Sequence, residues 1–210
     1  MTLLVDQLEL GPIGTNCYVV RASSDASEAV VIDPGGDVDE LRTALASNGV
    51  GCAGILITHG HWDHLGGVAD LAEETGAQVY MAEDERFLLE RLREFTPPGV
   101  PSRTYTPDVL LQGDETIELA GISFQTLRVP GHSPAHLAYY AEDCLFSGDV
   151  LFAGSIGRSD LPGGSPTDMN NSLRDVILPL DDEVIVCPGH GPQTTIGRER
   201  LTNPFLRDLA

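Results

Sequence analysis

The order of apolar and polar positions predicts short strands alternating with helices along most of the chain. Residues 3–10 and 16–21 alternate well enough to form two strands joined by a glycine-rich turn. A third strand is expected at 28–32, and 37–48 has the periodicity of an amphipathic helix that Gly49 ends. Strands interspersed with helices in this way favour an α/β (α+β) fold, in which helices cover the sheets.

The remaining elements follow from the same patterns. Residues 52–58 form a short apolar run typical of a buried strand, and a helix is expected at 65–75. The helix expected at 83–95 has a charged face and a stripe of Phe87, Leu88 and Leu92 that we expect to be buried. Further strands are expected at 78–81, 115–119, 122–129 and 183–187, with two more within 137–147, and further helices at 168–178 and 198–201.

Length and composition predict one domain that spans residues 1–210. The segment 96–108, rich in proline, threonine and serine, is expected to be a loop because both of its flanks belong to one layered fold. No run of 18 apolar residues suggests a membrane-spanning helix, and the first residues do not resemble a signal peptide. We therefore expect a cytoplasmic protein.

The four cysteines are widely spaced and form no C-x-x-C pair. They are expected to be free, buried thiols, which agrees with a reducing compartment.

The charge balance narrows the range of partners. The chain has 32 acidic and 12 basic residues, a net charge of −20, and every basic residue is arginine. This charge disfavours nucleic acid and anionic membranes, which need a basic surface. A salt-adapted or GC-rich host would also explain the bias without any functional role. Any anionic substrate must then be bound by local arginines.

The strongest chemical signal is the sequence from Thr58 to His64, in which His59, His61, Asp63 and His64 are four candidate metal ligands. They follow a predicted strand, where open α/β sheets tend to bind ligands. Side chains two residues apart in extended chain leave the same face, whereas the last two lie where the chain turns into a helix. One loop can thus supply two adjacent metal positions. Imidazole with carboxylate suits zinc, iron or manganese better than calcium or magnesium.

Three further candidates follow predicted strands, each beside glycine: His132, Asp149 and His190. Five of the six histidines therefore stand at strand ends, as a metal centre requires. Asp33 also follows a strand, and is either a turn residue or a carboxylate behind a metal-bound imidazole. His136 is expected to pack or hydrogen-bond behind the site, and Trp62 to have a packing role.

These motifs resemble the metallo-β-lactamase superfamily and, within it, a short branch of the glyoxalase II-like hydrolases, also called hydroxyacylglutathione hydrolases. The resemblance extends from about Leu8 to Leu206 and implies an αββα sandwich with metals at the sheet edges. It rests on the segments Thr58–His64, Pro130–Pro134, Gly148–Arg158 and Gly189–Gly197.

The resemblance also implies a division of the ligands between two divalent metals, zinc first, with iron or manganese as alternatives. His59, His61 and His132 would hold one metal, and Asp63, His64 and His190 the other. Asp149 would bridge them. A metal-bound hydroxide, oriented by the catalytic carboxylates Asp63 and Asp149, would attack a small-molecule thioester such as S-lactoylglutathione or another S-2-hydroxyacyl thiol. The chain has no G-x-S-x-G motif of a serine hydrolase.

The substrate prediction is limited by two departures from the glutathione thioesterases. Their helical C-terminal domain has no counterpart in this sequence. Their lysine and tyrosine after the bridging aspartate are replaced by Gly157-Arg158-Ser159-Asp160. Arg158 either binds a substrate carboxylate or forms a surface ion pair.

Four other functions are considered. A persulfide dioxygenase would use one iron on His59, His132 and Asp149, but the complete second ligand set favours hydrolysis. Lactone or β-lactam hydrolysis would use the same centre. A non-catalytic metal-binding domain is disfavoured because structural metal sites are closed, and RNA cleavage is disfavoured by the charge.

Overall fold

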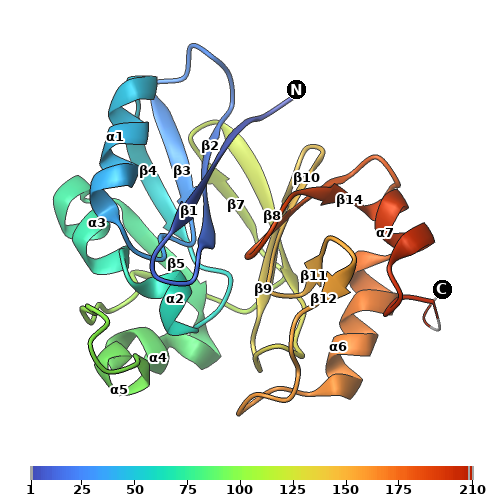
Figure 1. Ribbon diagram of the computed structural model, residues 1–210. Helices are drawn as coiled ribbons and strands as arrows, with labels where there is room; N and C mark the ends of the chain where they lie inside the picture. Colours follow the sequence, from blue (N-terminus) through green and yellow to red (C-terminus); the bar gives the residue numbers. More distant parts are fainter. Residues whose placement is uncertain (1, 208, 210) are drawn as a thin grey trace.

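The computed structural model describes residues 2–207 and 209. Within these residues, two six-stranded sheets face each other and helices cover their outer faces (Figure 1). Helices α1 (Val38–Asn48) and α3 (Val68–Thr75) flank the first sheet, and α6 (Pro166–Ser172) and α7 (Ile196–Thr202) flank the second. The predicted αββα sandwich is therefore confirmed.

The first sheet has the strand order β1-β2-β3-β4-β5-β6. Strands β1 to β3 pair antiparallel, and β3 to β6 pair parallel. The bounds are β1 (Leu4–Leu10), β2 (Thr15–Arg21), β3 (Glu28–Ile32), β4 (Gly51–Leu56), β5 (Gln78–Ala82) and β6 (Val109–Leu111).

The second sheet has the order β14-β13-β10-β9-β8-β7, in which only β10 and β13 pair parallel. A separate hairpin of β11 (Leu151–Phe152) and β12 (Ser155–Ile156) follows β10. The bounds are β7 (Thr116–Leu119), β8 (Ile122–Arg128), β9 (Leu137–Ala141), β10 (Cys144–Gly148), β13 (Ile185–Pro188) and β14 (Thr194–Thr195).

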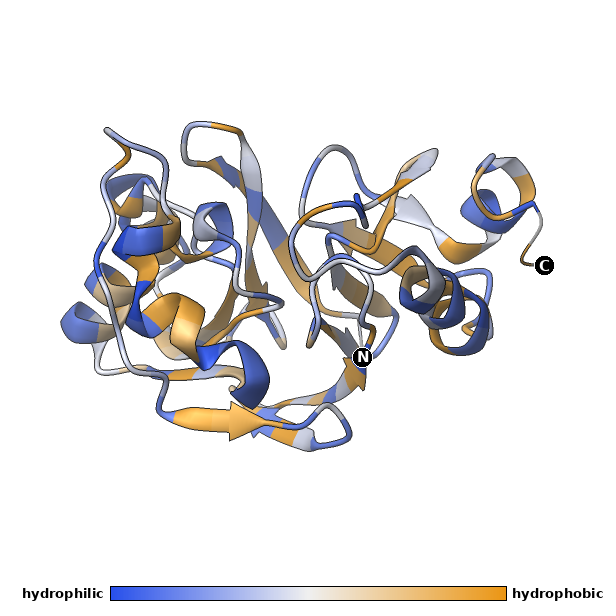
Figure 2. Cartoon of the chain, turned by 90° about the horizontal axis from the view of Figure 1, so that it is seen from below, coloured by the Kyte–Doolittle hydropathy of each residue, from blue (hydrophilic) through white to orange (hydrophobic). Residues whose placement is uncertain are grey.

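Three apolar layers hold the four structural layers together. The first, with Leu41 and Leu71, lies between the helices and the first sheet, and the second, with Phe124 and Tyr139, lies between the two sheets. The third, with Met169, lies between the second sheet and α6. Strands buried on both faces, such as β2, β3, β9 and β10, are apolar at consecutive positions. Figure 2 shows hydrophobic stretches in the strands beside helices that carry both hydrophobic and hydrophilic segments.

The middle of the chain departs from the single helix predicted at 83–95. A 3₁₀ turn (Glu83–Glu85) leads into α4 (Arg86–Glu90) and α5 (Leu92–Phe95), with the interruption at Arg91. The predicted buried stripe is also wrong in part, because Leu89 and Leu92 are buried while Phe87 is 43% exposed. The buried face of this segment runs through Glu85, Leu89 and Leu92, which leaves Phe87 on the exposed side.

The helix predicted at 65–75 is divided into α2 (Trp62–Leu65) and α3. Glycines occupy the division because the chain passes very close to the loop after β3. A Cβ atom on Gly66 would lie 2.4 Å from the carbonyl oxygen of Gly35. The earlier start at Trp62 places Asp63 and His64 on a helical turn.

Hydrogen bonds also join the first sheet to the segment that follows β13 in the second sheet. The Asn16 amide on β2 donates to the Gly189 carbonyl at 2.8 Å. Its side-chain amide donates to the carbonyls of Pro188 and Gly191, each at 2.8 Å. The segment after β13 is thereby fixed against the first sheet.

All four cysteines are free thiols, and three of them are buried. Within residues 2–207 and 209, no helix has the length and hydropathy needed to span a bilayer.

Candidate metal centre

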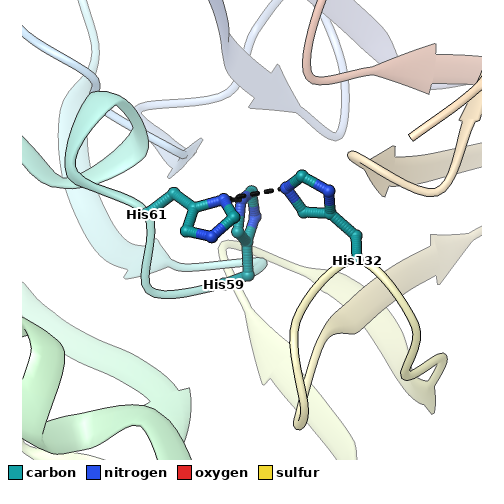
Figure 3. A group of neighbouring side chains, drawn as sticks. All are labelled: His59, His61 and His132. Atoms are coloured by element: carbon teal, nitrogen blue, oxygen red, sulfur yellow. Dashed lines mark hydrogen bonds between the residues drawn. The ribbon is translucent and has the colours of Figure 1, made fainter. Parts of the chain in front are cut away.

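The loop after β4 brings His59 and His61 against His132, which follows β8 (Figure 3). His59 is fully buried, and His61 Nδ1 lies 3.0 Å from His59 Nε2 and 2.8 Å from His132 Nε2. The ligand atoms of the three rings all lie within 4.8 Å of one another. Three imidazoles that converge in this way form one face of a metal site.

A second group forms beside the first from Asp63, His64 and His190, whose ligand atoms also lie within 4.8 Å of one another. Asp63 Oδ2 lies 3.3 Å from Nε2 of His64 and 3.3 Å from Nε2 of His190. Asp63 and His64 come from α2, and His190 comes from the loop after β13.

Asp149, which follows β10, contacts both groups. One carboxylate oxygen lies 3.5 Å from His64 Nε2, and the other lies 3.4 Å from His132 Nε2 and 3.6 Å from His190 Nε2. Gly189 packs against this carboxylate so closely that a Cβ atom there would lie 2.1 Å from Asp149 Oδ1. The structure thus brings all seven predicted ligands together, with Asp149 in the position of a bridge.

The unpaired atoms of the cluster show that its residues fit a divalent cation. Among the described residues, the buried atoms His64 Nε2 and Asp149 Oδ1 have no hydrogen-bond partner. Leaving a buried polar atom unpaired costs about 1–3 kcal/mol. Because the two atoms face each other across the centre, one cation would satisfy both.

The protonation states also suit metal binding, which requires neutral imidazoles and ionised carboxylates. Burial, aided by the neighbouring His132, lowers the pKa of His61 to about 4. Burial alone would raise the pKa of Asp149, but the charges of His64, His132 and His190 outweigh burial and lower the pKa to about 2.

His64 is the exception in the absence of a cation. Burial acts to lower its pKa, yet the charges of Asp33 and Asp149 raise the pKa well above its ordinary value. A proton on His64 is then the competitor that a metal ion has to displace.

Several side chains behind the ligands fix their orientation. Asp33 accepts hydrogen bonds from His64 Nδ1 at 2.9 Å and from the Thr58 hydroxyl and amide at 2.6 and 2.8 Å. Of its two predicted roles, Asp33 therefore fills that of the carboxylate behind an imidazole. His136 stays behind the site as predicted, because its Nε2 accepts from the Asp149 amide at 3.1 Å.

Two supporting residues had no signal in the sequence. The Thr15 hydroxyl donates to Asp63 Oδ2 at 2.9 Å. The buried Glu85 accepts from the amides of Gly60 at 2.6 Å and Ala135 at 2.8 Å. Glu85 therefore joins the loop of His59 and His61 to the loop of His132. Because Glu85 falls in the helix predicted at 83–95 with a charged face, its burial could not be predicted from the sequence.

The centre opens into a cavity of about 670 Å³. Arg158 lines this cavity, but its guanidinium is bonded to Asp160 at 2.9 and 3.0 Å and its side chain is 69% exposed. The Arg158 carbonyl accepts a hydrogen bond from His132 Nδ1 at 2.7 Å. The other lining residues are Ile13, His61, Trp62, Asp63, Phe95, His132, Asp149, Phe152, Leu161, Pro162 and His190.

Comparison with known proteins agrees with this fold and site. The family model of the metallo-beta-lactamase superfamily matches residues 10–190. The chain is 37% identical over 199 residues to hydroxyacylglutathione hydrolase GloC of Haemophilus influenzae, covering 91% of this chain and 92% of that protein. The chain belongs to the metallo-beta-lactamase superfamily, a hydrolytic family.

Two solved structures are similar over nearly the whole chain. The BLEG-1 B3 metallo-beta-lactamase superposes with a TM-score of 0.90 at 41% identity, covering 97% of this chain and all of that one. TTHA1623 in a di-iron-bound form superposes with a TM-score of 0.79 at 38% identity, covering 96% of this chain and all of that one. The di-iron form agrees with a site for two metals.

Proposed function

We propose that this protein is a thioester hydrolase with a dinuclear metal centre, acting on S-2-hydroxyacyl thiols. The observation that carries the proposal is the pair of three-ligand groups that both contact Asp149 and open into one cavity. The similarity to a hydroxyacylglutathione hydrolase supports the thioester as the substrate class.

The lining of the cavity favours water as the nucleophile. Among the described residues that line it, none is serine, threonine, cysteine, lysine or tyrosine, so the hydroxyl, thiol and amine nucleophiles of covalent catalysis are absent. Two divalent cations, zinc first, would supply an acidified water and a Lewis acid for the carbonyl. Asp63, which contacts Thr15 and His190, and Asp149, whose backbone amide donates to His136, would orient that water.

The decisive experiment measures metal content and turnover on one purified sample. Zinc, iron and manganese are counted per chain, and hydrolysis of S-lactoylglutathione is assayed beside oxygen uptake with glutathione persulfide. We expect about two metals per chain and thioester cleavage. One iron per chain with oxygen uptake would instead establish the persulfide dioxygenase.

A second candidate is hydrolysis of a β-lactam or a lactone. It is favoured by the similarity to BLEG-1, which is described as a B3 metallo-beta-lactamase. A chromogenic cephalosporin and an acyl lactone, assayed on the same metal-loaded sample, test it directly. Turnover of either one without thioester cleavage would replace the thioesterase proposal.

A further inference from the structure

A second cavity of about 380 Å³ adjoins the metal cavity. The two share Trp62, Phe95 and Pro162, together with the candidate ligand His61. Because these residues line both spaces, a molecule held at the metals can extend directly into the second cavity, which we call the side pocket.

The walls of the side pocket are largely apolar. Phe87 and Phe95, which are 43% and 41% exposed, meet edge to face with ring centroids 5.9 Å apart. Leu88 and Pro134 complete the apolar lining. Two exposed aromatic rings that line a concave surface beside a reactive centre are typical of a ligand-binding site.

The wall nearest the metals is fixed in place. A Cβ atom on Gly60 would lie 2.2 Å from Leu88 Cδ1, so the ligand loop and α4 are in close contact. Glu85, at the base of the pocket, is already occupied by the amides of Gly60 and Ala135. The pocket is therefore formed by the same contacts that position the metal ligands.

The charges around the two cavities disfavour an anionic occupant in the side pocket. Among the described residues that line it, none is basic, whereas Asp84 is acidic and pairs with Arg128. Arg158, which lines only the metal cavity of the two, pairs with Asp160. A polar or charged thiol arm is thus better placed on the side of Arg158, and the side pocket suits a neutral apolar group.

We infer that the side pocket binds the alkyl chain of the substrate's acyl group, so that the preferred substrates are S-2-hydroxyacyl thioesters with chains longer than lactoyl. This inference rests on the proposed thioesterase function. With the carbonyl at the metals, the acyl chain passes Trp62 and Phe95 and ends against Phe87 and Leu88. Burying a methylene contributes enough free energy for a threefold to fourfold gain in binding.

The first test uses the metal-loaded protein and N-acetylcysteamine thioesters of 2-hydroxypropanoic, 2-hydroxyhexanoic and 2-hydroxyoctanoic acids. We expect kcat/KM to rise by about threefold per added methylene, and by at least about 30-fold across the series. A flat or falling series with measurable hydrolysis would overturn the side pocket and leave the thioesterase proposal intact.

The second test does not depend on catalysis. Trp62 is the only tryptophan in the chain and lines the side pocket, so its fluorescence reports on occupancy. Octanamide should change the emission with saturation, and acetamide at the same concentrations should not. Saturable octanamide binding without any thioester hydrolysis would support the pocket while refuting the proposed function. Equal responses to both amides would overturn the pocket.

Two matched variants test whether octanamide binding and the preference for long acyl chains depend on the side pocket. Phe87→Asp places a charge on the pocket wall and is expected to weaken octanamide binding and to reduce the ratio of 2-hydroxyoctanoyl to lactoyl turnover about tenfold. Leu201→Asp makes the same kind of change at an 84% exposed position on α7 and should alter neither. Equal effects of the two variants would overturn the assignment.

Discussion

Asp149 contacts both groups of candidate ligands, one carboxylate oxygen facing His64 and the other facing His132 and His190. In Asp149→Asn, one oxygen becomes an amide nitrogen and the negative charge is lost. We expect metal content to fall from about two per chain to about one or less, and hydrolysis to fall at least about 100-fold. Elemental analysis and the thioester assay measure both.

Asp175→Asn is the matched control, since Asp175 is exposed and pairs only with Arg174 among the described residues. Full metal content in Asp149→Asn would contradict the bridging role.

Glu85 is a carboxylate whose two oxygens serve two different ligand loops. In Glu85→Gln, one oxygen is replaced by an NH₂ group that faces a backbone N–H donor, which leaves that buried donor unpaired. We expect the free energy of unfolding to fall by about 1–3 kcal/mol, measured by urea denaturation. Glu94→Gln, at a half-exposed ion pair with Arg91, should leave the free energy of unfolding essentially unchanged. Equal losses of unfolding free energy in the two variants would refute the role of Glu85 in joining the two loops.

The sequence indicated the seven candidate ligands but not the residues that support them. Five of the seven candidates stand beside glycine after an apolar strand, so the local pattern carried the information. Glu85 and Thr15 act on groups more than 20 residues away, and neither burial nor partner can be inferred from their neighbours. Phe87 was misplaced because the segment buries the face of Glu85, Leu89 and Leu92 instead.

Among the elements, those with a long apolar pattern were predicted almost to the residue, such as β3 at 28–32. Strands of two or three residues, such as β6, β11, β12 and β14, were not predicted, because a pattern of apolar and polar positions cannot be recognised over so short a segment. The division at Gly66 and Gly67 arises from close contact with the loop after β3, which is a tertiary effect.

The turn before β7 depends on a carboxylate and should therefore respond to pH. Burial acts to raise the pKa of Glu115, but hydrogen bonds from the amides of Gln112 and Gly113 and from the Thr126 hydroxyl outweigh burial and lower the pKa to about 2. The carboxylate thus stabilises the folded state fully above its ordinary pKa of 4.5, and this contribution is lost as pH falls toward 2.

The matching variant is Glu115→Gln. Its free energy of unfolding should be lower than that of the parent protein by about 1 kcal/mol at pH 7, a value reduced for solvent screening. The difference between the two proteins should be smaller near pH 2. Urea denaturation at several pH values measures the difference. A constant difference between pH 7 and pH 3 would contradict the assignment.

At the scale of the whole molecule, the proposed metal centre joins the two sheets. His59 and His61 follow β4 in the first sheet, whereas His132, Asp149 and His190 follow strands of the second. Bound ions stabilise the folded state, by about 2.7 kcal/mol when their concentration is about 100 times Kd. Removing them with a chelator should therefore lower Tm by about 5–10 °C. Differential scanning calorimetry measures the change.

Asp149→Asn, already short of metal, should show a smaller change on chelation. An unchanged Tm for the parent protein after verified metal removal would show that the centre does not stabilise the pairing of the sheets.

The acidic surface leads to expectations of a different kind. The charge of −20 predicts that neither nucleic acid nor an anionic membrane is a partner, and this stays a prediction, as does the cytoplasmic location.

The hydrogen bonds from Asn16 and Tyr18 to Pro188 join positions separated by about 170 residues. Contacts between such distant positions require a large loop to close and are costly in chain entropy, so we expect them to form late in folding. His190, two residues beyond Pro188, would then reach the other ligands only at the final stage of folding. A folding intermediate that already contains His59, His61 and His132 in place would bind its first metal ion before its second.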